Sequence, residues 1–419
     1  MFNIIGVVLL AVGEAGVKTF LDAFLADQLR AHEPKAYKNE DRVLARKRIW
    51  WLVALWWLVP VFFLTMYPWP TPLMISALVM GSTLILFSCG IRVYHCKESA
   101  GPGSRLTVFP VVKASILKRN LDYPTSPNQF FGNDGNQLCL SPQIKILRWL
   151  DKAAIIESSN LSAEAQRKVG RLCTVTEVQE LKLLFKMVPL WTTFLVFGLV
   201  VSTGKTFFPE QGNNMDSPDL IIYVLIIPSI SRKIKGYLLK FVANWATKPK
   251  KQAQMLKIWA GMMLSIFCCV VAWRVEVHRL NIVNEKGLLD KPDNVIIPMS
   301  IIWLAPQFCL LGLMQGLATD GLNEFVIDQF PESMEEYVTA INEFVIGIGS
   351  FLNILYVHAN RSLFSITLNH SRLDKHYKTL TVVSFINFCC YMFISTIYTS
   401  NDGRVGVDEI LQTSGADLV

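Results

Sequence analysis

Three ionisable side chains interrupt the first apolar stretch of the sequence and give its strongest chemical signal. Glu14, Lys18 and Asp22 are spaced four residues apart, so a helix places them on one face. An ionisable group is costly inside lipid, which makes Lys18 a functional candidate. Two interpretations remain open: Lys18 binds a solute or takes part in proton movement in a membrane cavity, or it is paired only with its two acidic neighbours.

Basic and aromatic residues farther along the chain suit the same kind of cavity. Lys186 follows Lys182 by about one helical turn, and both either point into a cavity or anchor the cytoplasmic end of a helix. Trp191 and Trp303 lie in apolar stretches, where they either line a cavity or pack in the protein interior. We expect cavity candidates at Lys186, Trp191 and Trp303.

A second group of acidic residues is periodic. Asp320, Glu324 and Asp328 recur every four residues, which places them on one face at the end of a helix. They predict a cytoplasmic gate or cap, with a solvated helix face as the alternative.

Patterns that would indicate other chemistry are missing from the sequence. The six histidines show no metal-ligand spacing, and no Ser-His-Asp set or pair of carboxylates suggests an enzyme. The nine cysteines are odd in number, and the adjacent pairs at 268–269 and 389–390 lie in apolar runs, which indicates buried thiols. We therefore expect no enzyme, no cofactor and no bound metal.

The elements that must position these residues follow from the composition. Of 419 residues, 52% are hydrophobic and only 17% are charged, too few charges to cover several soluble domains. The net charge of +7 comes from basic residues that lie between apolar runs, not on a basic face with aromatics as in nucleic-acid binders. The sequence therefore predicts a membrane protein that does not bind nucleic acid.

Apolar runs of the length that crosses a bilayer occur nine times, which predicts an all-α, multi-pass bundle. They are 1–24, 49–67, 72–93, 187–203, 220–239, 258–273, 295–318, 338–357 and 380–398. The basic loops 28–48, 94–186 and 232–257 are then cytoplasmic. Four parts follow: a partial N-terminal half (1–93), a cytoplasmic linker (94–186), a six-helix C-terminal half (187–398) and a cytoplasmic tail (399–419).

The linker contains an amphipathic stretch. Over 106–119, Val108, Val111, Ile116 and neighbouring apolar residues alternate with Lys113, Lys118 and Arg119 in a helical pattern. This pattern predicts a helix that lies on the cytoplasmic membrane surface.

Short motifs follow one another in a consistent order from residue 1 to about 398. They are AVGEAGVKT at 11–19, AFLADQ at 23–28, RWLDKAAII at 148–156, CTVT at 173–176, Pro189, Trp191, TFF at 206–208, Gln211, Gly212, Met215, Asp216, Trp303, PQF at 306–308, Gly312, Glu324, Phe325, Asp328, Gln329 and SRLD at 371–374. This series resembles the plant nitrate/peptide transporter family within the proton-dependent oligopeptide transporters.

The resemblance implies a major-facilitator-type bundle in which this sequence supplies the family's helices four to twelve. It implies a proton-coupled symporter that moves nitrate, peptides or another small solute by alternating access, in the plasma or vacuolar membrane. The family's Glu-x-x-Glu-Arg/Lys motif occurs in no membrane segment, and Gln315 replaces an acidic residue, so it cannot titrate there. The alternative is a transport-inactive protein that associates with a full-length transporter chain.

Overall fold

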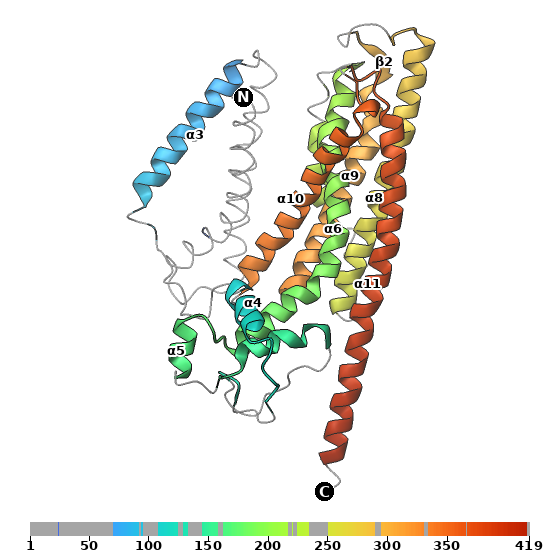
Figure 1. Cartoon of the computed structure of the whole chain (residues 1–419). Coiled ribbons are helices and arrows are strands. Elements are labelled where there is room, and N and C mark those ends of the chain that lie inside the picture. The colour runs from blue at the N-terminus through green and yellow to red at the C-terminus, as the bar shows by residue number, and fades with distance from the viewer. Residues whose placement is uncertain are drawn as a thin grey trace, which may run out of the picture. The chain divides into compact units, whose positions relative to one another are not determined.

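The computed structural model describes the larger part of the chain (Figure 1). The described residues are 24, 70–91, 94, 108–124, 129–132, 145–157, 162–216, 220, 224–233, 250–289, 295–330, 334–365 and 367–416. The chain forms two compact units, Met1–Ala100 with Asp219–Tyr223, and Gly101–Pro218 with Val224–Val419.

The first unit contains helix α3 (Pro70–Gly90), which coincides with the predicted segment 72–93. Its 21 residues reach about 30 Å at 1.5 Å per residue, the thickness of a hydrocarbon core. The rings of Phe24, Phe87 and Tyr94 form a cluster with centroids 5.1–5.6 Å apart. The candidates Glu14, Lys18 and Asp22 lie outside the described residues.

The second unit is a bundle of long helices. Its elements in chain order are α4 (Val108–Leu117), η2 (Lys145–Ala154), α5 (Ala163–Lys168), α6 (Val175–Asn213), β1 (Met215–Asp216), helix 224–233, α8 (Lys250–Glu285), β2 (Ile297–Ser300), η4 (Ile301–Leu304), α9 (Ala305–Ile327), α10 (Glu335–Ala359), η6 (Arg361–Leu363) and α11 (Leu373–Ala416). Within the described ranges, five helices are long and apolar enough to cross a membrane. The predicted all-α class is confirmed.

Some element boundaries differ from those expected from hydropathy. The predicted segment 187–203 is only the central part of α6, which has 39 residues and begins with a capping box between Thr174 and Glu177. The predicted segment 295–318 begins as strand β2, which pairs in parallel with β1, and continues through η4 into α9. Helix α11 continues through the expected tail to Ala416.

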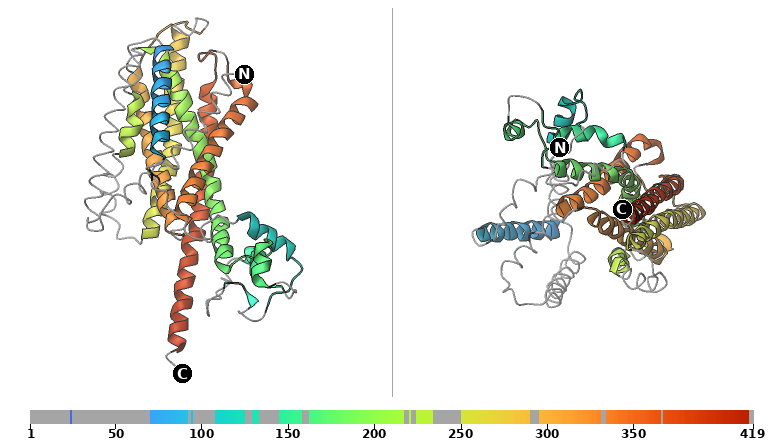
Figure 2. Two further views of the ribbon diagram at one scale, coloured as in Figure 1. Left: turned by 90° about the vertical axis from the view of Figure 1, so that its left-hand side faces the viewer. Right: turned by 90° about the horizontal axis from the view of Figure 1, so that it is seen from below.

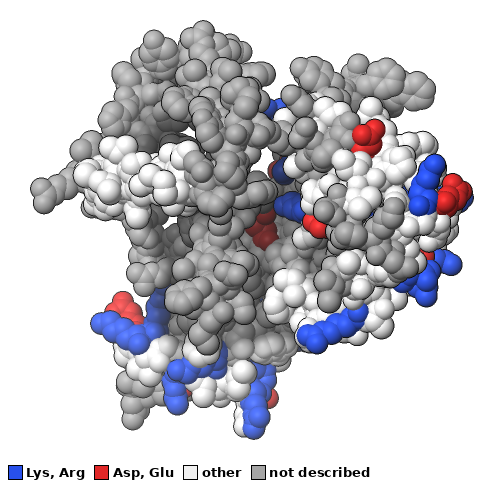
Figure 3. Space-filling model, turned by 90° about the horizontal axis from the view of Figure 1, so that it is seen from above, with Lys and Arg blue, Asp and Glu red and all other residues white. Residues whose placement is uncertain are grey.

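The two ends of this unit are distinct. Figures 1 and 2 show α4, α5 and the end of α11 at one end, here named the linker end. The paired strands β1 and β2 lie at the other end, here named the strand end. Figure 3 shows that basic and acidic side chains are interspersed on the described surface seen from the strand end.

Helix packing in this unit depends on close backbone approach. Helix α8 packs against α9 and α11, and α6 packs against α10. A Cβ on Gly198 would lie 2.4 Å from the carbonyl oxygen of Ile346, and one on Gly349 would lie 2.3 Å from that of Leu195. Glycine at both positions therefore lets α6 and α10 touch, as small residues do between membrane helices.

The linker folds against α6, and one face of α4 is buried within it. Val111, Ala114, Ser115 and Lys118 are buried, and α4 packs on η2. The sequence pattern grouped Lys118 with the polar residues Lys113 and Arg119, but the structure buries it, and its ammonium donates a hydrogen bond of 2.6 Å to the carbonyl of Ile155. Burial lowers the pKa of Lys118.

Candidate functional site

A chain of polar side chains crosses the linker half of the bundle interior. The Nε1 of Trp191 on α6 donates to Oδ1 of Asn342 on α10 at 2.7 Å, and Nδ2 of Asn342 donates to Oδ1 of Asn323 on α9 at 2.8 Å. Trp191 is only 8% exposed. The first hydrogen bond fixes the indole of Trp191 against α10. Together, the two hydrogen bonds join helices α6, α10 and α9.

A pocket of about 460 Å³ lies between α6 and α10 in the half of these helices nearer the strand end. Its lining is uncharged and consists of Ser202, Thr206, Phe207, Gly347, Ser350, Phe351, Asn353, Ile354 and Val357. Thr203 donates to Asn353 at 3.3 Å, and the Asn353 amide donates to Ser202 at 3.3 Å. These bonds orient one amide and several hydroxyls beside apolar walls, which is the usual make-up of a small-molecule site.

A histidine lies behind one wall of this pocket. His376 is fully buried, and its ring lies 5.4 Å from the rings of Phe207 and Phe364 and 5.1 Å from that of Tyr356. Neither ring nitrogen has a hydrogen-bond partner among the described residues. The imidazole is therefore held by aromatic packing, and Phe207 belongs to both the packing cluster and the pocket.

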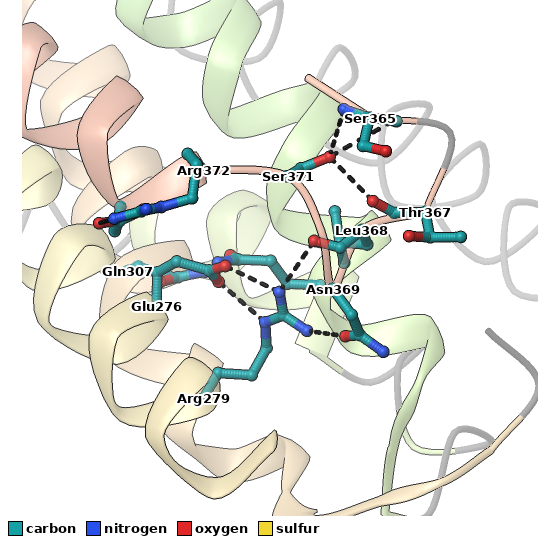
Figure 4. Close-up of polar contacts among 11 residues, drawn as sticks. Glu276, Arg279, Gln307, Ser365, Thr367, Leu368, Asn369, Ser371 and Arg372 are labelled. Carbon is teal, nitrogen blue, oxygen red and sulfur yellow. Dashed lines mark hydrogen bonds and ion pairs between the residues drawn. The ribbon is translucent and has the colours of Figure 1, made fainter. Parts of the chain in front are cut away.

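A fully buried ion pair lies at the strand end of α8 (Figure 4). Arg279 donates to both carboxylate oxygens of Glu276, at 2.9 and 2.8 Å, and neither side chain is exposed. Three further amides complete the network. Gln211 of α6 donates to Glu276 at 2.5 Å, Gln307 of α9 donates to Gln211 at 3.0 Å, and Asn369 accepts from Arg279 at 2.8 Å.

Our sequence analysis did not identify this network, although part of its signal is visible. Glu276 and Arg279 follow the apolar segment 258–273 at a spacing of three residues, which places them on one helical face. Their partners come from distant segments, so the sequence alone could suggest the pair but not its neighbours.

The predicted gate or cap residues are all tied to neighbouring helices at the linker end. Asp320 lies 3.8 Å from Arg232 of helix 224–233. Glu324 pairs with Lys257 of α8 at 2.5 Å, and Asp328 accepts from Gln254 of α8 at 2.5 Å. The acidic face of α9 therefore contacts two other helices.

The linker is fixed to the base of α6 by a second ion pair. Lys182 lies 2.5 Å from Asp151 of η2, whose side chain is 5% exposed. Burial raises the pKa of Asp151, while the hydrogen bond from Lys182 opposes this shift. Lys182 therefore anchors the linker instead of pointing into a cavity.

The remaining predicted cavity residues lie apart from the pocket. The backbone carbonyl of Lys186 accepts a hydrogen bond from Tyr398 of α11. Trp303 is 53% exposed on η4, with its ring 5.0 Å from that of His278. Gln315 is half-buried on α9, and its carbonyl accepts from Thr319. In the part of the chain that the structure describes, no three potential ligands gather as a metal site would require.

Long apolar helices with polar networks in their interior define a multi-spanning helical membrane protein. The sequence profile of the POT family (PTR2) matches residues 1–372. The chain belongs to this family, whose members are membrane transporters and not enzymes, so the predicted family is confirmed.

Relatives and solved structures agree with this assignment. The chain is 31% identical to protein NRT1/PTR FAMILY 5.5 of Arabidopsis thaliana over 78% of its length, and 31% identical to NRT1/PTR FAMILY 5.7 over 94%. It spans 64% and 69% of these relatives. The POT family transporter PepTSo matches with a TM-score of 0.60 and 12% identity, covering 94% of this chain and 77% of that one. An auto-inhibited POT family peptide transporter matches with a TM-score of 0.57 and 14% identity, covering 91% and 74%. The predicted major-facilitator-type fold is confirmed.

Proposed function

We propose that this chain carries a small solute across a membrane by alternating access, with the α6–α10 pocket as part of the solute pathway. Membership of the POT family supports transport, and the uncharged pocket is the observation that supports this location. Nitrate, a peptide or another small solute fits the family resemblance. Asn353 would orient the solute, because its amide can both donate and accept hydrogen bonds.

The proposal assigns the other candidate residues by their positions. Trp191 holds α6 against α10 behind the pathway, while Lys186, Trp303 and Gln315 line it in other conformations. Glu14, Lys18 and Asp22 handle the proton or the solute charge, since the pocket lining has no ionisable side chain. Asp320, Glu324 and Asp328 close the cytoplasmic end through their ties to α8 and helix 224–233.

Uptake into proteoliposomes that contain the full chain tests the proposal. We expect labelled nitrate or a labelled dipeptide to enter faster under an inward proton gradient, and a protonophore to remove the difference. Asn353→Leu should lower uptake about tenfold, the effect of losing an oriented hydrogen bond in a solute site. Asn360→Leu, at the end of the same helix and outside the pocket, is the matched control.

Two other results would decide against parts of the proposal. Equal uptake by N353L and N360L would remove the pocket from the pathway. No uptake of any solute by the intact chain would favour the alternative of a transport-inactive partner of another transporter chain, which the similarity to known transporters does not support.

A fluorescent fusion observed with plasma-membrane and vacuolar markers would distinguish the two proposed locations.

A further inference from the structure

Helix α4 of the linker carries large apolar side chains on the side away from the protein. Phe109 is 75% exposed, Ile116 56% and Leu117 53%. Phe109 and Ile116 are seven residues apart, so they lie on the same helical face, and Lys113 lies between them on that face. This outer face, defined by Phe109, Lys113, Ile116 and Leu117, has no partner among the described residues.

The opposite face fixes the orientation of α4. The hydroxyl of Ser115 donates to the carbonyl of Leu150 at 3.2 Å, and Lys118 donates to that of Ile155 at 2.6 Å. Lys152 of η2 donates to the carbonyl of Arg119 at 2.7 Å. Because these bonds hold the C-terminal part of α4 on η2, the helix cannot turn its apolar residues inward without breaking them.

The charged residues of the segment that carries this face have one sign. Lys113 and Arg119 are exposed, and no acidic residue occurs between Glu98 and Asp122. Exposed apolar side chains combined with Lys and Arg are typical of helices that lie in the headgroup region of an anionic membrane.

The position of α4 places it close to the apolar part of helix α6. Helix α4 contacts α6, and it lies on the side of the linker nearest the helix bundle (Figures 1 and 2). Lys182, which holds η2, precedes the apolar segment 187–203 by five residues, about 8 Å along a helix. The headgroup region on each side of a bilayer is roughly 5–8 Å thick.

We propose that the outer face of α4 rests in the cytoplasmic leaflet and binds anionic phospholipids there. Phe109 and Ile116 enter the boundary between headgroups and acyl chains, while Lys113 and Arg119 contact the lipid phosphates. The linker is then held on two sides, by α6 and by the membrane. This inference concerns lipid binding and does not depend on whether the chain moves a solute.

Amide hydrogen exchange of the full chain in nanodiscs tests the proposal. We compare nanodiscs of phosphatidylcholine alone with nanodiscs in which part of this lipid is replaced by phosphatidylserine. Amides of 108–120 should exchange more slowly with phosphatidylserine, by about fivefold for each basic residue that engages the lipid, and added salt should reduce the effect. The double variants F109S/I116S and K113E/R119E should lose this slowing.

Matched controls come from the same linker. Val169, which is 61% exposed after α5, and the exposed Lys168 lie outside α4, so V169S and K168E should leave the slowing intact. Unchanged exchange of 145–154 in the double variants would show that η2 remains folded. Equal exchange of 108–120 in both lipids and in detergent would overturn the proposal. Slowing that disappears when the protein is diluted would show that a second copy covers this face, which overturns it as well.

Discussion

The pair of Glu276 and Arg279 is the residue-scale feature that most clearly holds the strand end together. Removing two charges from water is costly, and their mutual attraction compensates only if the remaining polar atoms are also bonded. Gln211 and Asn369 supply these bonds from α6 and from the segment before α11. The network therefore fixes several distant segments in one arrangement.

Removing one member of this pair should be strongly destabilising. In Arg279→Met, the Glu276 carboxylate remains buried without its counter-charge, at a cost of about 3–5 kcal/mol. We expect the melting temperature of the purified chain to fall by roughly 10 °C. Arg372→Met is the control, since Arg372 pairs with Asp374 at 3.1 Å but is 51% exposed, and exposed pairs contribute little. Equal melting temperatures for the two variants would contradict this account.

At the scale of elements, the contact between α6 and α10 depends on Gly198 and Gly349. In Gly349→Ala, the new Cβ would overlap the Leu195 carbonyl, and backbone cannot move aside as a flexible side chain can. We expect a loss of about 1–3 kcal/mol from overpacking, seen as a lower melting temperature. Gly347→Ala on the same helix meets nothing within 4 Å and should be neutral or slightly stabilising. An unchanged melting temperature for G349A would mean that α6 and α10 are packed less tightly than the structure shows.

The linker element can be tested through Cys173, which is 3% exposed beside η2. Burial raises the pKa of this thiol to about 11. Because this value lies above the ordinary one of about 8.5, the stability that the neutral thiol gives to docking is present below about pH 8.5 and is lost as the pH rises through about 11. At pH 8, iodoacetamide should modify Cys173 at least about a hundredfold more slowly than in the denatured chain. Comparable rates by peptide mass spectrometry would show that the linker is not docked.

At the scale of the whole molecule, the sequence correctly predicted those structural features that depend on the residues of one continuous segment. Apolar runs such as 258–273 and 338–357 predicted membrane helices, because length and hydropathy alone decide whether a helix can span a bilayer. Strands β1 and β2 escaped prediction, since strands of two and four residues carry no usable periodicity. The α6–α10 pocket and the Glu276 network were also missed, because their members meet only after folding.

The two ends of helix α9 are held by interactions of different strength, and this predicts which end of the helix moves more easily. The strand end has the fully buried Glu276–Arg279 pair, whereas Glu324 and Asp320 at the linker end are 47% and 40% exposed. Exposed pairs contribute at most about 1 kcal/mol, so they separate and re-form easily. Amides of 320–328 should therefore exchange faster than those of 305–312 within the same helix α9.

Variants extend this test to both ends of the bundle. D320N/E324Q should increase the difference in exchange rate along α9, since this helix loses its ion pairs with Arg232 and Lys257 at the linker end. Arg279→Met should reduce the difference, because it loosens the strand end, where Gln307 joins α9 to the network through Gln211. Equal exchange at both ends of α9 in the unmodified chain, measured in the same nanodiscs, would show that the buried network does not set the direction of movement.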